Sequence, residues 1–273
     1  MKMKRFLYMI LLLALLAGLC ACGQKQSTAD GMSSGQSAVD STVKPADVGD
    51  DRSDTQREPF ADYEITPLAD AKIGDYVLFG AYEQDNDPGN GKEPILWRVI
   101  GWTSSGPLLL SEYILDVRAF NDVLEECDWM SCSLQQWLNG EFYQAAFSED
   151  DKARIDDVTI ISQEEIHMYM GEYDEYGNWG YTLENLQCRL TDYASSRCIQ
   201  ALIDAGATEE QAREHLASRD NASWYWTRSM TADRRVPVTI IYSGMMDDRY
   251  SFNVAETWGG VRPVVWVSFV PLG

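Results

Sequence analysis

The chain has 273 residues, of which 45% are hydrophobic and 11% are aromatic, and this composition excludes a disordered chain, a collagen-like repeat and a coiled coil. Its 43 acidic and 22 basic residues give a formal net charge of −21 at pH 7. Nucleic acids and anionic membrane surfaces are bound through clustered Lys and Arg, so this charge argues against both as partners. The length fits one domain plus additional segments.

The N-terminus carries the pattern of a secretory signal. Basic residues among the first five precede an uncharged apolar run at residues 6–19, which is too short for a typical membrane-spanning helix of about 20 residues. The run ends in Leu-Cys-Ala-Cys at residues 19–22, which resembles the bacterial lipobox. The resemblance implies a lipoprotein signal peptide at residues 1–22 and lipid attachment at Cys22. A cleaved signal without lipid and an uncleaved anchor are the alternatives.

Residues 23–62 are dominated by Ser, Thr, Gly, Gln and Asp and contain few large apolar side chains. Such a segment buries too little apolar surface to offset its chain entropy, so we expect a disordered polar tether. A single folded domain is expected at residues 63–273.

The first part of this domain is predicted to form a hairpin. Residues 75–82 and 95–102 are rich in β-branched and aromatic side chains, which is typical of strands. The turn-forming residues 85–91 lie between them. Residues 107–111 predict a third, buried strand.

The middle of the chain predicts short helices. Apolar residues recur at helical spacing over residues 133–147, and Gly140 is expected to break this segment into two helices. Ser148 and Asp151 resemble a capping box for a further helix that runs to Ile155.

Residues 192–205 and 208–217 predict a helical hairpin. Gly206 can adopt the left-handed conformation that ends the first helix, and Thr208 with Gln211 can cap the second.

Further strands are expected at residues 158–161, 223–229, 236–243 and 261–269. Because helices and strands do not alternate regularly, the predicted class is α+β, with a mainly antiparallel sheet and several short helices.

Several motifs then occur in a characteristic order. They are GAYEQ at residues 80–84, GKEPILWRV at 91–99, WMSCSLQQWLN at 129–139, CRLTDYA at 188–194, WTRS at 226–229 and GVRPVVW at 260–266. Over about residues 72–270 the chain resembles a bacterial family called domain of unknown function 6273, found on secreted or lipid-anchored proteins. We expect the following motif residues to have structural roles: Trp137, Trp226, Arg228, Arg262 and Pro263.

The last two motifs also resemble the C-type-lectin-like fold of formylglycine-generating enzymes, which implies that fold for this domain. In the WTRS motif, Thr227 stands before the Arg where the domain of unknown function 6273 family usually shows Leu. Residues 197–221 look like an insertion, so we assign the helical hairpin at residues 192–217 to an insertion.

Candidate catalytic groups are few. The two histidines, His167 and His215, fall in predicted helices among polar residues, and we expect them to be solvated rather than catalytic. The sequence contains no Gly-x-Ser-x-Gly elbow, His-Glu-x-x-His pair, P-loop or Rossmann fingerprint.

Four cysteines follow the lipobox: Cys127, Cys132, Cys188 and Cys198. Their spacings match neither a zinc knuckle nor a redox dithiol, and buried free thiols are expected, although oxidation would allow three pairings. Formylglycine-generating enzymes need reactive cysteines near the C-terminus, so the fold is expected without that activity.

Asp85, Asp87 and Asn90 offer oxygen ligands for calcium, but their spacing does not fit an EF-hand. A plain turn is the preferred interpretation, and we expect no metal and no cofactor.

The loop at residues 173–181 combines aromatic, amide and carboxylate groups with glycines, as ligand recognition requires. Its ligand-binding candidates are Tyr176, Asn178, Trp179 and Tyr181. The alternative is that these aromatic rings fix the loop to the core.

The sequence therefore predicts an extracytoplasmic protein, held at the cell membrane only by a lipid anchor, that binds a cell-surface carbohydrate or protein without chemistry. The alternatives are an enzyme acting on cell-surface glycan, a divergent relative of the formylglycine-generating enzymes, and an envelope scaffold.

Overall fold

The computed structural model describes residues 60–173, 179–181, 183–248 and 252–270. The predicted signal peptide, including Cys22, and most of the predicted tether lie outside these residues. Within the described part of the chain, no helix is long and apolar enough to cross a membrane.

The first of two larger sheets is antiparallel throughout, with strand order β1-β2-β3-β12-β5. Its strands are β1 (Tyr76–Tyr82), β2 (Glu93–Trp102), β3 (Pro107–Ser111), β12 (Pro263–Trp266) and β5 (Val158–Ile160). The hairpin predicted from the turn formers is present as β1 and β2. The third strand is buried at every position, as the sequence predicts.

The second sheet has the order β10-β9-β8-β11-β4 and is antiparallel except where β11 meets β8. Its strands are β10 (Met246–Asp247), β9 (Pro237–Ile240), β8 (Tyr225–Met230), β11 (Gly260–Val261) and β4 (Asp116–Val117). A separate hairpin pairs β6 (Gly171–Tyr173) with β7 (Trp179–Tyr181). The α+β class with mainly antiparallel sheets is therefore confirmed.

The two larger sheets share connections. The final strand predicted at residues 261–269 is divided by Arg262, with β11 in the second sheet before it and β12 in the first sheet after it. The indoles of Trp97 and Trp226 are fully buried and donate to the carbonyl oxygens of Phe79 and Arg118, at 2.7 and 2.8 Å.

The predicted break at Gly140 is wrong. Helix α2 (Ser133–Trp137) continues through a π-helical turn, η1 (Leu138–Phe142), into α3 (Tyr143–Ala146). Glycine costs a helix about 1 kcal/mol, and the burial of neighbouring apolar side chains, such as Leu138 and Phe142, outweighs that cost.

The remaining short helices begin at capping boxes. Ser148 and Asp151 cap α4 (Glu149–Lys152), which ends before the predicted Ile155. Ser162 and Glu165 cap α5 (Gln163–Tyr169) in the same way. Helix α6 (Leu183–Leu186) follows β7.

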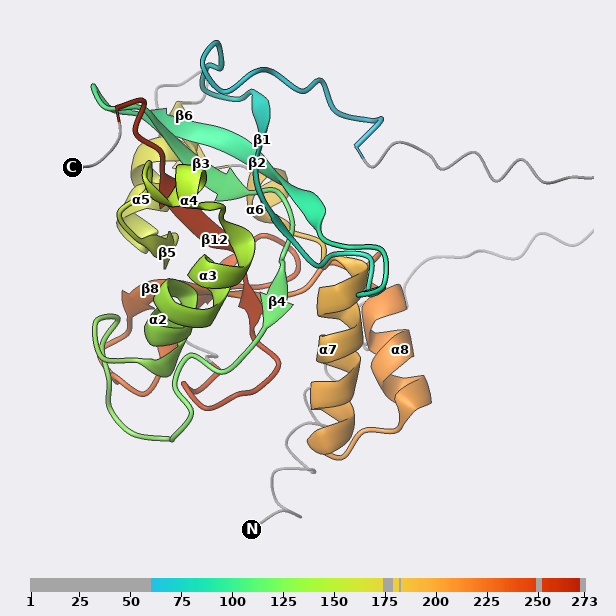
Figure 1. The fold of residues 1–273 in the computed structure, drawn as a ribbon. Helices are drawn as coiled ribbons and strands as arrows, with labels where there is room; N and C mark the ends of the chain where they lie inside the picture. The colour runs from blue at the N-terminus through green and yellow to red at the C-terminus, as the bar shows by residue number, and fades with distance from the viewer. Residues whose placement is uncertain (1–59, 174–178, 182, 249–251, 271–273) are drawn as a thin grey trace, which may run out of the picture. The chain divides into compact units, whose positions relative to one another are not determined.

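Helices α7 (Asp192–Asp204) and α8 (Glu209–Ala217) form the predicted helical hairpin and lie side by side at one edge of the domain (Figure 1). Gly206 has a φ of +109°, and the N–H groups of Gly206 and Ala207 bond the carbonyls of Ile203 and Leu202. This pattern is a Schellman motif, which satisfies the last carbonyls of α7.

A buried carboxylate attaches this hairpin to the second sheet. The Arg197 Nε atom on α7 lies 2.5 Å from Oδ1 of Asp116 on β4. The Tyr82 hydroxyl donates to the other oxygen of Asp116 at 2.8 Å. Asp116 is therefore partnered by the helical hairpin and by the first sheet together.

Candidate functional site

Strand register places an aromatic ring beside a cation on the first sheet. Tyr76 on β1 lies directly opposite Arg98 on β2, and residues opposite each other in an antiparallel pair project from the same face. The guanidinium carbon of Arg98 is 5.6 Å from the centre of the Tyr76 ring. At this separation the ring quadrupole attracts the charge.

The same guanidinium forms a two-pronged ion pair. Arg98 Nε donates to Oε2 of Glu112 at 3.1 Å, and its Nη2 donates to Oε1 at 2.8 Å. The Arg98 and Glu112 side chains keep 20% and 13% of their surface exposed. Bidentate pairing fixes both side chains and leaves Nη1 of Arg98 outside these two bonds.

Two further tyrosines complete what we call the tyrosine–arginine cluster, which consists of Tyr63, Tyr76, Arg98, Glu112 and Tyr113. The hydroxyls of Tyr63 and Tyr113 are 3.0 Å apart, and the Tyr63 ring meets the Tyr76 ring edge-on at 4.7 Å. Burial, the bond to Tyr113 and the charge of Glu112 raise the pKa of Tyr63. The Tyr63 phenol therefore stays protonated at neutral pH.

A second arginine, Arg262, lies in the core beside the Glu112 carboxylate of this cluster. It is fully buried, its Nε donates to the Ser111 carbonyl at 2.8 Å, and its Nη1 donates to the Tyr225 hydroxyl at 3.2 Å. Its Nη2 atom lies 3.9 Å from Oε2 of Glu112 and makes no hydrogen bond. Glu112 consequently faces two guanidiniums, one partly exposed and one buried.

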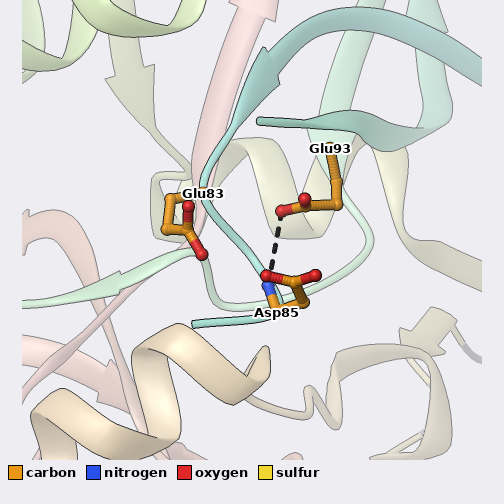
Figure 2. Close-up of side chains that lie close together, drawn as sticks. All are labelled: Glu83, Asp85 and Glu93. Atoms are coloured by element: carbon orange, nitrogen blue, oxygen red, sulfur yellow. Dashed lines mark hydrogen bonds between the residues drawn. The ribbon is translucent and has the colours of Figure 1, made fainter. Parts of the chain in front are cut away.

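A second group of charged side chains gathers at the β1–β2 turn (Figure 2). The carboxylates of Glu83, Asp85 and Glu93 have oxygen atoms within 4.8 Å of one another. Oε2 of Glu93 accepts from the backbone N–H groups of Gln84 at 2.7 Å and Asp85 at 3.3 Å, the latter drawn dashed in Figure 2. Desolvation and the neighbouring carboxylates raise the pKa of Glu83.

The side chains that the sequence offers as calcium ligands form hydrogen bonds within this turn. Asn90 donates its side-chain amide to Asp85 at 2.6 Å, which holds the pKa of Asp85 below its usual value. The backbone N–H of Asp87 donates to Asp85 at 2.8 Å, and Asp87 accepts from Gly89 at 3.0 Å. These bonds are those of an Asx-type turn, the preferred interpretation.

The family model described as domain of unknown function 6273 (DUF6273) matches residues 105–269. The chain belongs to the DUF6273 family. No curated protein and no solved structure matches the chain. The match begins after the motifs at residues 80–84 and 91–99, which lay within the expected range of about 72–270.

The DUF6273 match divides the tyrosine–arginine cluster. Glu112, Tyr113 and the underlying Arg262 lie inside the matched residues, whereas Tyr63, Tyr76 and Arg98 precede them. The cluster therefore combines the family's part of the domain with the chain's first two strands.

The other motif residues of the DUF6273 domain have contacts of their own. Arg228 on β8 pairs with Glu165 through two contacts, at 2.7 and 2.6 Å, and donates to the Ile160 carbonyl at 2.6 Å. The Arg118 guanidinium lies 4.3 Å from the centre of the Trp137 ring. Pro263 begins β12, a position that tolerates its missing N–H.

Only part of the ligand-binding loop expected at residues 173–181 belongs to the described residues. Tyr176 and Asn178 lie outside the described residues. Trp179 and Tyr181 lie on β7, where the backbone alone is described. Their role stays a prediction.

The four described cysteines of the DUF6273 domain are buried free thiols, as expected. Burial raises the pKa of Cys132 to about 12, of Cys188 to about 11 and of Cys198 to about 12. A raised pKa removes the thiolate that nucleophilic and redox chemistry use.

The expectation of two solvated histidines is wrong for His215. It is mostly buried, and its ring meets Trp258 edge-on at 5.8 Å. Burial lowers the pKa of His215 to about 4. The polar sequence around it hides a contact made with the C-terminal part of the chain, whereas His167 is exposed.

Proposed function

We propose that the chain is a carbohydrate-binding protein displayed outside the cytoplasm, with the tyrosine–arginine cluster as its binding site. The observation that carries the proposal is the grouping of three partly exposed tyrosine rings around one bidentate arginine–glutamate pair.

The chemistry of the cluster suits a sugar. A pyranose ring presents apolar C–H groups on its faces and hydroxyls on its rim, so it is recognised by aromatic rings together with a few fixed polar groups. Tyr63 and Tyr113 supply hydroxyls, and Arg98 supplies the donors of Nη1. Two of the cluster's residues lie on strands, which limits how far the site can deform.

The environment of the thiols favours binding over an oxidase of the formylglycine-generating type. That chemistry needs a reactive thiolate, and burial moves the pKa of Cys132, Cys188 and Cys198 in the opposite direction. An enzyme acting on glycan remains the rival class, and product formation from a bound glycan would reveal it.

Attachment through a lipid at Cys22 is part of the proposal. Its support is the Leu-Cys-Ala-Cys sequence after a short apolar run, followed by a polar segment. Mass spectrometry of membrane-extracted protein should find a mature N-terminus at Cys22 that carries diacylglycerol. A soluble mature protein that starts at another residue would contradict it.

We also propose that the domain is related to the C-type-lectin-like fold. The supporting features are the aromatic strand β8, which carries Trp226 and Arg228, and the closing segment that passes through Arg262 into β12. Superposition of an experimental structure on domains of that fold tests the relation, and a different strand order would refute it.

The binding proposal is tested with the full-length chain in detergent micelles on a glycan array. We expect retention of a subset of glycans and a loss of about tenfold in affinity for Tyr113→Ala, the size expected when one aromatic contact is removed. Tyr143→Ala is the matched control, because Tyr143 is also partly buried but lies on α3.

Absence of binding to every glycan would refute the proposal. Binding that survives Tyr113→Ala but is lost in Trp179→Ala would move the site to the loop at residues 173–181.

A further inference from the structure

We infer that the saccharide bound by the tyrosine–arginine cluster is acidic and that Arg98 pairs with its carboxylate. The inference rests on the proposed function and adds to it the class of ligand. It follows from how charge is distributed around Glu112.

Two guanidiniums share one carboxylate in this cluster. Arg98 makes two hydrogen bonds to Glu112, and Arg262 lies 3.9 Å from the same carboxylate. Among the described residues, Glu112 is the carboxylate within salt-bridge distance of either arginine. Within the described part of the chain, one positive charge is therefore left without a carboxylate partner.

The neighbouring groups do not supply the second negative charge. Arg262 bonds a backbone carbonyl and the Tyr225 hydroxyl, which are both neutral acceptors. Burial raises the pKa of Tyr225 to about 12 and that of Cys188 to about 11, so both are protonated at neutral pH. The excess charge persists under physiological conditions.

Two other arginine–carboxylate pairs of the described chain have one guanidinium for each carboxylate. Arg228 pairs with Glu165, and Arg197 pairs with Asp116. A local positive excess is also unusual in a chain whose net charge is −21. A ligand anion would give the Glu112 site the equal number of cations and anions that these two pairs have.

Arg98 is the residue that can reach this anion. Arg262 is fully buried, whereas the Arg98 side chain is 20% exposed. Glu112 occupies Nε and Nη2 of Arg98, which leaves Nη1 for the ligand. A planar carboxylate fits the guanidinium plane, and the tyrosine rings fit the attached sugar ring.

The test compares oligogalacturonate with the same oligomer after methyl esterification, which removes the charge and keeps the sugar chain. Affinities are measured by calorimetry with the full-length chain in detergent micelles. We expect the acidic oligomer to bind about tenfold tighter or more, as charge-assisted hydrogen bonds predict. The difference should shrink when salt is raised, because this site is partly exposed.

Arg98→Gln should lose the preference for the acidic oligomer, and Arg228→Gln should retain it. Arg228 is the matched control, since its pair with Glu165 is also bidentate and comparably exposed, at 25% and 16%. Thermal melts check that both variants fold. If Arg98→Gln does not fold, the affinities of the wild-type chain for the acidic and the esterified oligomer still test the inference.

The outcomes separate the two proposals. Equal affinity for the acidic and esterified oligomers would overturn the inference and leave carbohydrate binding intact. A preference that Arg98→Gln preserves would also overturn it. Tighter binding of an oligomer of neutral sugars that carries sulfate groups than of oligogalacturonate would show that the bound anion is a sulfate and not a carboxylate, and would also overturn the inference. Failure to bind any glycan would remove the proposed function itself.

Discussion

Arg262 and Tyr225 connect the two larger sheets of the domain. Arg262 stands between β11 and β12, at the point where the chain passes from the second sheet to the first. Its Nη1 donates to the Tyr225 hydroxyl on β8, and its Nε donates to the Ser111 carbonyl at the end of β3. One guanidinium is thus bonded to both sheets.

Arg262→Ala is expected to lower the free energy of unfolding by about 3 kcal/mol, because it leaves buried acceptors without donors and Glu112 without its second cation. Thermal or urea denaturation measures the loss. Arg228→Ala should cost less, since its side chain is 25% exposed. An unchanged melt combined with lost ligand binding would show that Arg262 serves the ligand instead.

Gly206 and Gly140 should respond in opposite directions to alanine. Gly206→Ala is expected to destabilise by about 1 kcal/mol, because the φ of +109° at the end of α7 disfavours a side chain. Gly140→Ala should stabilise by about 0.5–1 kcal/mol, since Gly140 lies within η1 and an added Cβ would meet no heavy atom within 4 Å. Urea midpoints of the two variants test both signs.

These two glycines also show what the sequence predicts and what it does not. Gly206 ends its helix as expected, because the helix end is set by local backbone conformation and by nearby hydrogen bonds. Gly140 does not break its helix, because the outcome depends on the core that Leu138 and Phe142 enter. Local rules predict caps and turns, whereas packing against distant strands overrides propensity.

The tyrosine–arginine cluster could not be predicted by the same rules. Tyr63, Arg98 and Glu112 come from separate segments, and none belongs to a catalytic or metal-binding motif. The pairing of Tyr76 with Arg98 requires the register of β1 and β2, and the approach of Arg262 requires the passage between the sheets. The β-branched and aromatic composition of residues 95–102 is the signal that the sequence offers, and it does not specify which strand residues face each other.

The stability of the domain should depend on the protonation of His215. Burial lowers its pKa from 6.5 to about 4, so the unfolded chain binds a proton more readily than the folded one. The contribution of His215 to the free energy of unfolding is complete above about pH 6.5 and declines by roughly 3 kcal/mol as the pH falls to about 4.

Urea denaturation of the wild type and of His215→Phe between pH 7 and pH 4 isolates this effect from the titration of the carboxylates. The variant should lose less stability on acidification. His167→Phe, at an exposed position on α5, should follow the wild type. Identical pH profiles for the wild type and His215→Phe would contradict the prediction.

The buried thiols should resist modification. At pH 8 a disulfide reagent is expected to label Cys132, Cys188 and Cys198 on the order of a hundredfold more slowly in the folded chain than in urea, because burial suppresses the thiolate. Peptide mapping by mass spectrometry assigns the labelled sites. Recovery of a cross-linked pair of cysteine peptides from the native protein would show that the thiols oxidise.

The ends of the helical hairpin give it a modular character. The segment that holds α7 and α8 begins after Arg189 and ends before Ala222, and these two residues form an isolated antiparallel bridge, reinforced by the ion pair between Arg189 and Asp220. Because departure and return points coincide, the tips of α7 and α8 can be lengthened, shortened or replaced by a grafted reporter without displacing a strand. The boundary of that freedom is Arg197, since Asp116 needs it as a partner.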